Sequence, residues 1–176
     1  RFSRENRGFF YWHNSCNIAR LTAAIAAIAA TAEIAEIKGE FVVKVRKITI
    51  IGGGNGGFAA AADLTIRGHE ITLYELPDFR NGLAEVIEKG GIELETLPSN
   101  GLKGGFAKIH KITFDIEEAL KASDIVFVIV PSNALETIAK LCAPHVRENQ
   151  IITLCPANFG GSIMFRKVLK QNGCDK

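Results

Sequence analysis

The residues of this sequence best suited to chemistry are five glycines among the six consecutive residues 52–57. Gly52, Gly54 and Gly57 fit the spacing G-x-G-x-x-G. In that pattern the first glycine permits a tight turn, the second lets a ligand approach the backbone, and the third lets a helix pack closely on a strand. Because amide N–H groups and the positive dipole end of a helix bind phosphate, the spacing predicts a site for the pyrophosphate of a dinucleotide.

The segments around the glycines predict the strand, turn and helix that such a site needs. A β-branched run at residues 45–51 predicts a strand, and the Ala-rich residues 58–64 predict a helix. Gly68 suits the left-handed position that ends a helix, and residues 69–75 predict a second strand. Glu75 ends this strand about 20 residues after the glycines, where a carboxylate accepts hydrogen bonds from the adenosine ribose. The alternatives are a flexible glycine loop and an ordinary solvated acid.

The carboxylate of Glu75 favours NAD as the cofactor, because it would repel the 2′-phosphate of NADP. Arg80 follows closely and would attract that phosphate, so NADP is kept as the alternative. The predicted cofactor-binding residues come from the turn, the end of the second strand and the end of a later strand: Gly52, Gly53, Gly54, Asn55, Gly56, Gly57, Glu75, Val130, Pro131 and Ser132.

That later strand is predicted at residues 125–130, which are uniformly apolar as in a parallel strand covered by helices on both faces. We interpret it as the central strand, so that Val130, Pro131 and Ser132 lie at the carboxyl edge of the sheet beside the glycines. An alternative is that Pro131 begins the next helix, with Ser132 or Asn133 as its cap.

The remaining segments complete an α/β pattern. They predict a short helix at residues 83–89, a hairpin of 91–95 with 105–109, a strand at 109–113, a helix at 116–121 capped by Asp115, a helix at 134–141, a strand at 150–155 and a helix from 164 to 169. This order predicts a Rossmann fold, doubly wound, with a mainly parallel sheet and helices on both faces. Residues 45–176 form the predicted domain.

Residues 1–44 are predicted to be an N-terminal extension that is not necessarily native. Within it, residues 21–37 predict an Ala-rich helix, with a disordered tail as the alternative. The uncharged part is shorter than the roughly 20 apolar residues of a membrane span. A secretory signal ending at Ala30-Thr31-Ala32 is a further alternative, as is upstream read-through before a translation start near Val42.

The composition of the chain limits the classes of partner that are expected. The net charge of +2 is too small to indicate a nucleic acid or a membrane surface. The four cysteines are widely separated and predict neither a metal site nor a disulfide framework, and Cys155 in its apolar strand is interpreted as a core residue. Reduced thiols and a dinucleotide cofactor together predict a cytoplasmic protein. Exposed apolar surface at the carboxyl edge of the sheet would allow a homodimer.

Three stretches resemble the N-terminal domain of the octopine/nopaline (opine) dehydrogenase family: 50–57, 122–132, and 154–160 leading into Phe165. The resemblance implies an oxidoreductase that joins an amino acid to a 2-oxo acid, with NADH or NADPH delivering hydride to an imine. Ketopantoate reductase and glycerol-3-phosphate dehydrogenase have similar glycine turns and reduce a carbonyl instead. A dinucleotide sensor without catalysis is an alternative from another class.

The resemblance also implies which residues are not expected here. The acid/base histidine of the opine family and its carboxylate partner belong to a following helical domain, which is absent from this chain, so no catalytic residue is predicted. His13, His69, His110 and His145 are interpreted as surface or loop residues. Asn158 is the predicted substrate contact, because the family presents an amide side chain at that position.

Overall fold

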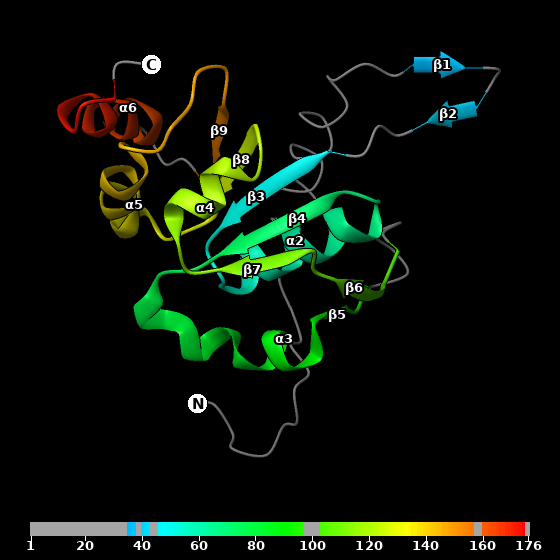
Figure 1. The fold of residues 1–176 in the computed structure, drawn as a ribbon. Helices are drawn as coiled ribbons and strands as arrows, with labels where there is room; N and C mark the ends of the chain where they lie inside the picture. Colours follow the sequence, from blue (N-terminus) through cyan, green and yellow to red (C-terminus); the bar gives the residue numbers. More distant parts are fainter. Residues whose placement is uncertain (1–34, 38–39, 43–45, 97–102, 157–159, 175–176) are drawn as a thin grey trace.

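A computed structural model describes residues 35–37, 40–42, 46–96, 103–156 and 160–174. Its centre is a five-stranded sheet with the order β7-β4-β3-β8-β9 (Figure 1). Every pairing within this sheet is parallel, which confirms the predicted α/β class and Rossmann topology. The strands are β3 (Lys47–Ile51), β4 (Glu70–Tyr74), β7 (Lys111–Thr113), β8 (Ile125–Val128) and β9 (Ile151–Leu154).

Helices cover both faces of the sheet because successive strand residues point to opposite sides. Ile48 and Ile50 of β3 pack in one apolar cluster with α2 and α3, whereas Ile51 packs in a second cluster with α4, α5 and α6. The helices are α2 (Asn55–Ile66), α3 (Ala84–Lys89), α4 (Ile116–Lys121), α5 (Leu135–Cys142) and α6 (Gly161–Gln171), with 3₁₀ segments η1 (Pro77–Leu83) and η3 (Ser132–Ala134).

The middle position of the sheet belongs to β3, so the prediction that residues 125–130 form the central strand was wrong. β8 is fully buried but lies between β3 and β9, and it ends at Val128. An apolar run shows that both faces are covered, but it does not distinguish the middle strand from its neighbour. The chain passes from β3 to β4 on one side and later to β8 on the other. Ligands of open α/β sheets bind where the strand order reverses in this way.

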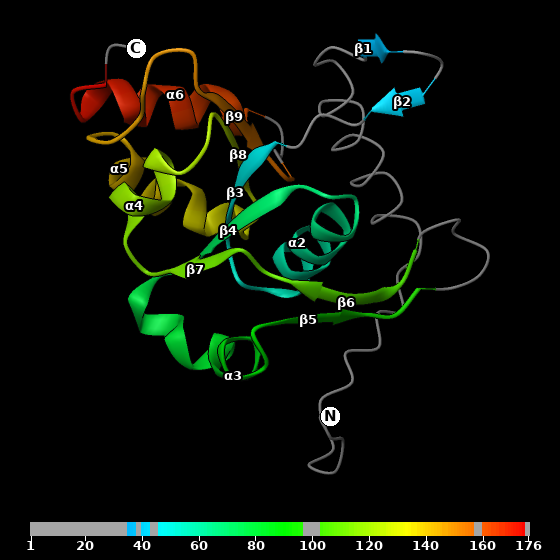
Figure 2. The ribbon, with the colours of Figure 1, turned by 45° about the vertical axis from the view of Figure 1, so that its right-hand side comes forward.

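Two antiparallel hairpins lie outside the sheet. The predicted hairpin is confirmed as β5 (Gly91–Leu94) with β6 (Gly105–Lys108), and it runs along α2 (Figures 1 and 2). The other pairs β1 (Ala35–Ile37) with β2 (Glu40–Val42). The helix predicted over residues 21–37 is therefore wrong at its end, where pairing with β2 takes the backbone groups that a helix would use. Residues 21–34 lie outside the described part.

The helix ends follow the predicted signals, with one exception. Asp115 caps α4, since its Oδ1 accepts hydrogen bonds from the amides of Glu117 (2.9 Å) and Glu118 (3.3 Å). Gly68 follows α2 with φ of 93°, a conformation that suits glycine. At α5, however, η3 precedes the helix and no side chain caps its start, so the alternative in which Ser132 or Asn133 is a cap is not supported.

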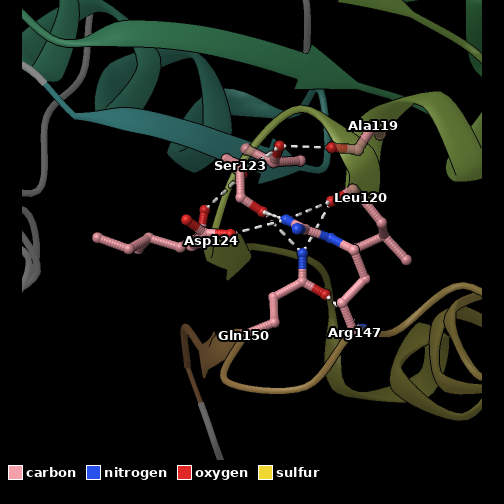
Figure 3. A network of polar contacts seen from close by, with 8 residues as sticks. Ala119, Leu120, Ser123, Asp124, Arg147 and Gln150 are labelled. Atoms are coloured by element: carbon pink, nitrogen blue, oxygen red, sulfur yellow. Dashed lines mark hydrogen bonds and ion pairs between the residues drawn. The ribbon is translucent and has the colours of Figure 1, made fainter.

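A polar network at the amino edge ties the segments before β8 and β9 to the C-terminus of α4 (Figure 3). Arg147 donates through Nη2 to the carbonyl of Ser123 and to the carboxylate of Asp124, both at 2.8 Å. Gln150 donates to the carbonyls of Ser123 and Leu120, also at 2.8 Å. The donors satisfy carbonyls that the end of a helix leaves without partners, so the network holds β8 and β9 in register.

Arg147→Ala is expected to lower the free energy of unfolding by about 1–2 kcal/mol, the net contribution of one or two hydrogen bonds to carbonyls. Urea denaturation measures this change. Asp124→Ala is the matched control: this carboxylate is 82% exposed, and an exposed ion pair contributes about 0.5 kcal/mol or less. Equal losses in the two variants would show that the ion pair, and not the carbonyl contacts, carries the effect.

Candidate cofactor site

The glycine turn lies directly at the end of β3 and requires glycine at its first position. Gly52 has φ of 118°, and a Cβ there would overlap the carbonyl oxygen of Ile129. The amide of Gly52 donates to the carbonyl of Tyr74 at 2.9 Å, which fixes the start of the turn against the end of β4. Gly57 is equally constrained, because a Cβ there would overlap the carbonyl oxygen of Gly52. Both predicted geometric roles are present.

The start of α2 is open to a ligand. A Cβ on Gly54 would meet nothing within 4 Å, so the backbone there faces free space. Gly54 is the N-cap residue, no side chain caps the helix, and its first turn holds no acidic residue. The first amide N–H groups of α2, which have no partner within a helix, are thus available to an anion. The helix begins at Asn55, three residues earlier than the apolar pattern indicated.

Glu75 lies beside the turn and is held by it. Its Oε2 accepts a hydrogen bond from the amide of Gly53 at 2.6 Å, and its Oε1 accepts one from the amide of Leu76 at 2.8 Å. The side chain of Leu83 also lies against Gly53, on the side that a Cβ would occupy. Glu75 is therefore in the predicted place at the end of β4, with a contact to the turn that the sequence did not reveal.

The segment after β8 meets the turn as predicted. The amide of Ile129 donates to the carbonyl of Ile51 at 2.8 Å, and Val130 Cγ1 would lie 3.0 Å from a Cβ on Gly52. Val130 is half-buried, whereas Pro131 and Ser132 are exposed. The fold thus brings together the turn, Glu75 and Val130, and Pro131 and Ser132 follow directly in the chain. The predicted substrate contact, Asn158, lies outside the described residues.

The cysteines and the tyrosine near the site are core groups. Cys155 is 6% exposed within an apolar cluster, and burial raises the pKa of its thiol. Burial likewise raises the pKa of Cys142 and of Tyr74 to about 12. These groups stay protonated at neutral pH and are poor nucleophiles. The interpretation of Cys155 as a core residue is confirmed.

The described residues contain no group of histidine, cysteine, aspartate and glutamate side chains that could hold a metal ion. Among the helices that the structure describes, none is long and apolar enough to cross a membrane. His110 is exposed and His145 is half-buried, and both lie in loops as predicted.

His69 was interpreted as a surface or loop residue: it lies in a loop directly before β4, but at 8% exposure it is buried and is not a surface residue. The amide of Arg46, directly before β3, donates to its Nδ1 at 3.4 Å. Burial lowers the pKa of His69, and the charges of Arg67 and Arg46 lower it further, while Asp63 opposes them.

This lowered pKa predicts how stability depends on pH. A neutral His69 binds fewer protons in the folded chain than in the unfolded one, whose histidine pKa is about 6.5. Its contribution is therefore complete above that pH and is lost as pH falls below it. We expect the free energy of unfolding, measured with urea at several pH values, to fall less between pH 7 and pH 5 in His69→Gln than in the unaltered protein. His110→Gln is the exposed control, and an identical pH dependence in all three would contradict the assignment.

A cleft of about 890 Å³ lies along the outer edge of β7, facing η1 and α3. Arg80 stands at this cleft with its guanidinium 4.5 Å from the ring centre of Phe114, in a cation–π contact. The amide of Glu75 donates to the carbonyl of Thr113, the residue before Phe114, at 3.3 Å. The structure therefore places Arg80 beyond the end of β4, next to the strand that neighbours Glu75.

Comparison with known proteins decides the family. The family described as "NAD-dependent glycerol-3-phosphate dehydrogenase N-terminus" matches residues 47–157. The chain belongs to this family. The predicted NAD(P)-binding Rossmann domain of an oxidoreductase is thereby confirmed. The match begins at the first residue of β3, and it includes the turn, Glu75 and residues 130–132.

The chain is also similar in sequence to an opine dehydrogenase and to glycerol-3-phosphate dehydrogenases. The chain is 33% identical over 132 residues to the opine dehydrogenase of Arthrobacter sp. (strain 1C), covering 75% of this chain and 35% of that protein. It is 30% identical over 130 residues to the glycerol-3-phosphate dehydrogenase [NAD(P)+] of Saccharophagus degradans, covering 73% of this chain and 34% of that protein. The chain therefore spans about a third of the length of these curated relatives.

The structure is similar to that of octopine dehydrogenase solved with NADH and pyruvate. The TM-score is 0.62 at 25% identity, covering 73% of this chain and 33% of that one. A ketopantoate reductase from Ralstonia eutropha JMP134 has a TM-score of 0.54 at 23% identity, covering 69% and 37% of the two chains. The resemblance to the opine family and the relation to glycerol-3-phosphate dehydrogenase are confirmed, and the ketopantoate reductase shares the fold.

Proposed function

We propose that this dehydrogenase domain holds its nicotinamide dinucleotide across the carboxyl edge of the sheet. The amides at the start of α2, from Gly54 to Gly57, bind the pyrophosphate, and Glu75 accepts hydrogen bonds from the adenosine ribose. Residues 130–132 line the path towards the nicotinamide. The observation that carries the proposal is the uncapped helix start at Gly54, where free amides face open space beside a carboxylate.

We propose NAD as the preferred dinucleotide. Glu75 places a negative charge where the 2′-phosphate of NADP would lie. Arg80, in the η1 segment that follows β4, offers that phosphate a cation, so the preference should be modest. The two charges act in opposite directions on the same group, and each is partly screened by solvent at this rim.

The reaction proposed for the whole protein is opine-type reduction. Bound NADH supplies a hydride to the carbon of an imine formed from an amino acid and a 2-oxo acid, and the imine nitrogen takes up a proton. Support comes from the 33% identity to an opine dehydrogenase and from the likeness to a structure solved with NADH and pyruvate. In this proposal a following helical domain supplies the acid/base histidine and its carboxylate, while Asn158 contacts the substrate.

A second candidate is reduction of a carbonyl in a phosphorylated three-carbon substrate. The family match to glycerol-3-phosphate dehydrogenase favours it, and the glycine turn serves either reaction equally, because it contacts only the cofactor. The two candidates differ in the residues that would contact the substrate, and these are not among the described residues.

Two measurements test this proposal. Fluorescence titration of the protein with NADH should give saturable binding, tighter than with NADPH. NADH oxidation by the product of the entire gene should then be followed with arginine and pyruvate, and separately with dihydroxyacetone phosphate. Turnover with the first pair alone supports the opine-type reaction, and turnover with the second alone supports the other candidate. Failure of the domain to bind either dinucleotide would refute the cofactor site itself.

Two further proposals concern where the protein is located and how it assembles. A dinucleotide-dependent enzyme belongs where the dinucleotide is kept, so we expect a cytoplasmic protein. Ile163, near the start of α6 and so after the carboxyl end of β9, is 74% exposed, and exposed apolar surface at this edge would favour association into a homodimer. Sedimentation at several protein concentrations would reveal a dimer.

A further inference from the structure

Glu75 turns its carboxylate inward, towards the glycine turn. Each of its two oxygens already accepts a backbone hydrogen bond, from Gly53 at 2.6 Å and from Leu76 at 2.8 Å. An acid whose only task was to bind ribose would need its oxygens at the rim. Here the carboxylate joins the end of β4 to the turn that follows β3, across two neighbouring strands of the sheet.

We propose that Glu75 is a positioning residue for the pyrophosphate: it holds the turn at Gly53 in its binding conformation before the cofactor arrives. This inference rests on the proposed cofactor site. It extends the role of Glu75 from the ribose to the diphosphate, a group that the carboxylate itself would repel. Glu75 should therefore strengthen the binding of a diphosphate ligand even when that ligand has no ribose hydroxyls.

The composition of the turn explains why such a residue is needed. Five glycines among six residues lose more backbone freedom on ordering than other residues do. A ligand that had to order the turn would bind more weakly by that cost. A hydrogen bond from an amide to a carboxylate is about twice as strong as a neutral one, so Glu75 is well suited to order the turn in advance.

Gly53 provides independent support for this role. The dinucleotide-binding pattern leaves this position variable, yet a Cβ there would lie 2.6 Å from Leu83 Cδ1 and 3.1 Å from Glu75 Oε2. Leu83 is fully buried and has little room to move. The space that a side chain at position 53 would occupy is thus filled by the side chains of Leu83 and Glu75. Gly53→Ala should displace the carboxylate while leaving it in the protein.

The test uses two ligands that differ only in the ribose hydroxyls, ADP and 2′,3′-dideoxy-ADP, each measured by competition with NADH. Glu75→Ala should weaken dideoxy-ADP about tenfold, and ADP by more, because ADP also loses its hydroxyl contacts. If Glu75 acts on the ribose alone, its removal should leave dideoxy-ADP unchanged or bound more tightly, since a nearby negative charge has gone. Either of those results would overturn the proposal.

Three further variants distinguish a positioning role of Glu75 from a general loss of structure in the site. Glu75→Gln keeps one acceptor oxygen. Its affinity for dideoxy-ADP should therefore lie between the affinities of the unaltered protein and of Glu75→Ala. Glu85→Ala, which removes a solvent-facing acid of α3, should bind both ligands normally. Gly53→Ala and Glu75→Ala should be non-additive when combined, because each breaks the same contact. Full additivity in that double variant would contradict the proposal.

Hydrogen exchange of the ligand-free protein gives a readout that does not depend on binding. The amide of Gly53 should exchange faster in Glu75→Ala, while amides of β3 keep their protection. Unchanged exchange at Gly53 would count against the proposal, whereas an unaltered protein that binds neither NADH nor ADP would refute the cofactor site instead.

Discussion

Gly54→Val should weaken NADH binding by about 100-fold or more while leaving the domain folded. The isopropyl group would occupy the open space that the backbone of Gly54 faces, where the pyrophosphate is expected. Losing two hydrogen bonds to a charged group, at roughly 1.5–3 kcal/mol each, corresponds to a change of this size. Fluorescence titration with NADH measures the affinity, and urea denaturation checks the fold.

Gly54→Ala is the matched control for this experiment. The φ of −90° at Gly54 is accessible to any residue. A single methyl group also reaches less far than an isopropyl group into the open space beside the turn. The affinity should fall between those of the unaltered protein and Gly54→Val. If valine at this position left NADH binding unchanged in a folded protein, the pyrophosphate would not lie over this part of the turn.

Gly57→Ala should have the largest effect on stability, lowering the free energy of unfolding by about 3 kcal/mol or more. The added methyl would overlap the carbonyl oxygen of Gly52, so helix α2 would have to move away from the end of β3. That helix contributes the buried Phe58 and Leu64 to the apolar cluster on its face of the sheet. Urea denaturation measures the change.

The comparison with Gly54→Ala separates packing from glycine content. Both variants remove one glycine from the same turn, but of these two positions, 57 lacks room for a Cβ and 54 has it. Gly54→Ala should change the free energy of unfolding by about 0.5 kcal/mol or less. Equal destabilisation by the two variants would mean that backbone freedom, and not the close approach of α2 to β3, explains the requirement for glycine.

The sequence was sufficient to predict the parts of the site that depend on local pattern. A β-branched strand, a glycine turn and a helix follow one another within some twenty residues, so β3, the turn and α2 could be located. The long apolar run likewise identified β8 as an inner strand. Because parallel strands end at a common edge, the meeting of the turn, Glu75 and Val130 could be predicted as well.

The parts that escaped prediction depend on contacts between distant segments. The inward hydrogen bond from Gly53 to Glu75 requires knowing the side-chain direction at the end of β4. The unusual glycine at a variable position of the motif was the one available signal for it. The buried His69 contacts Arg46, a residue 23 positions earlier in the chain, and periodicity carries no information about such a contact.

The polar backbone groups at the two edges of the sheet have different roles. At the amino edge, Arg147 and Gln150 use side chains to satisfy carbonyls between strands, which fixes the sheet. At the carboxyl edge, the amides at the start of α2 have no side-chain cap, which leaves them for a ligand. Substitutions at Arg147 should therefore change stability with little effect on cofactor affinity, and substitutions at Gly54 should do the reverse.

The most direct test of the account is NMR observation of the backbone amides of residues 54–57 during titration with NADH. Pyrophosphate bound at the start of α2 should shift these four amide resonances strongly and protect them from exchange, with far smaller changes at the amino edge around Arg147. If NADH saturates the protein and these amides keep their positions, the dinucleotide binds elsewhere and the account is wrong.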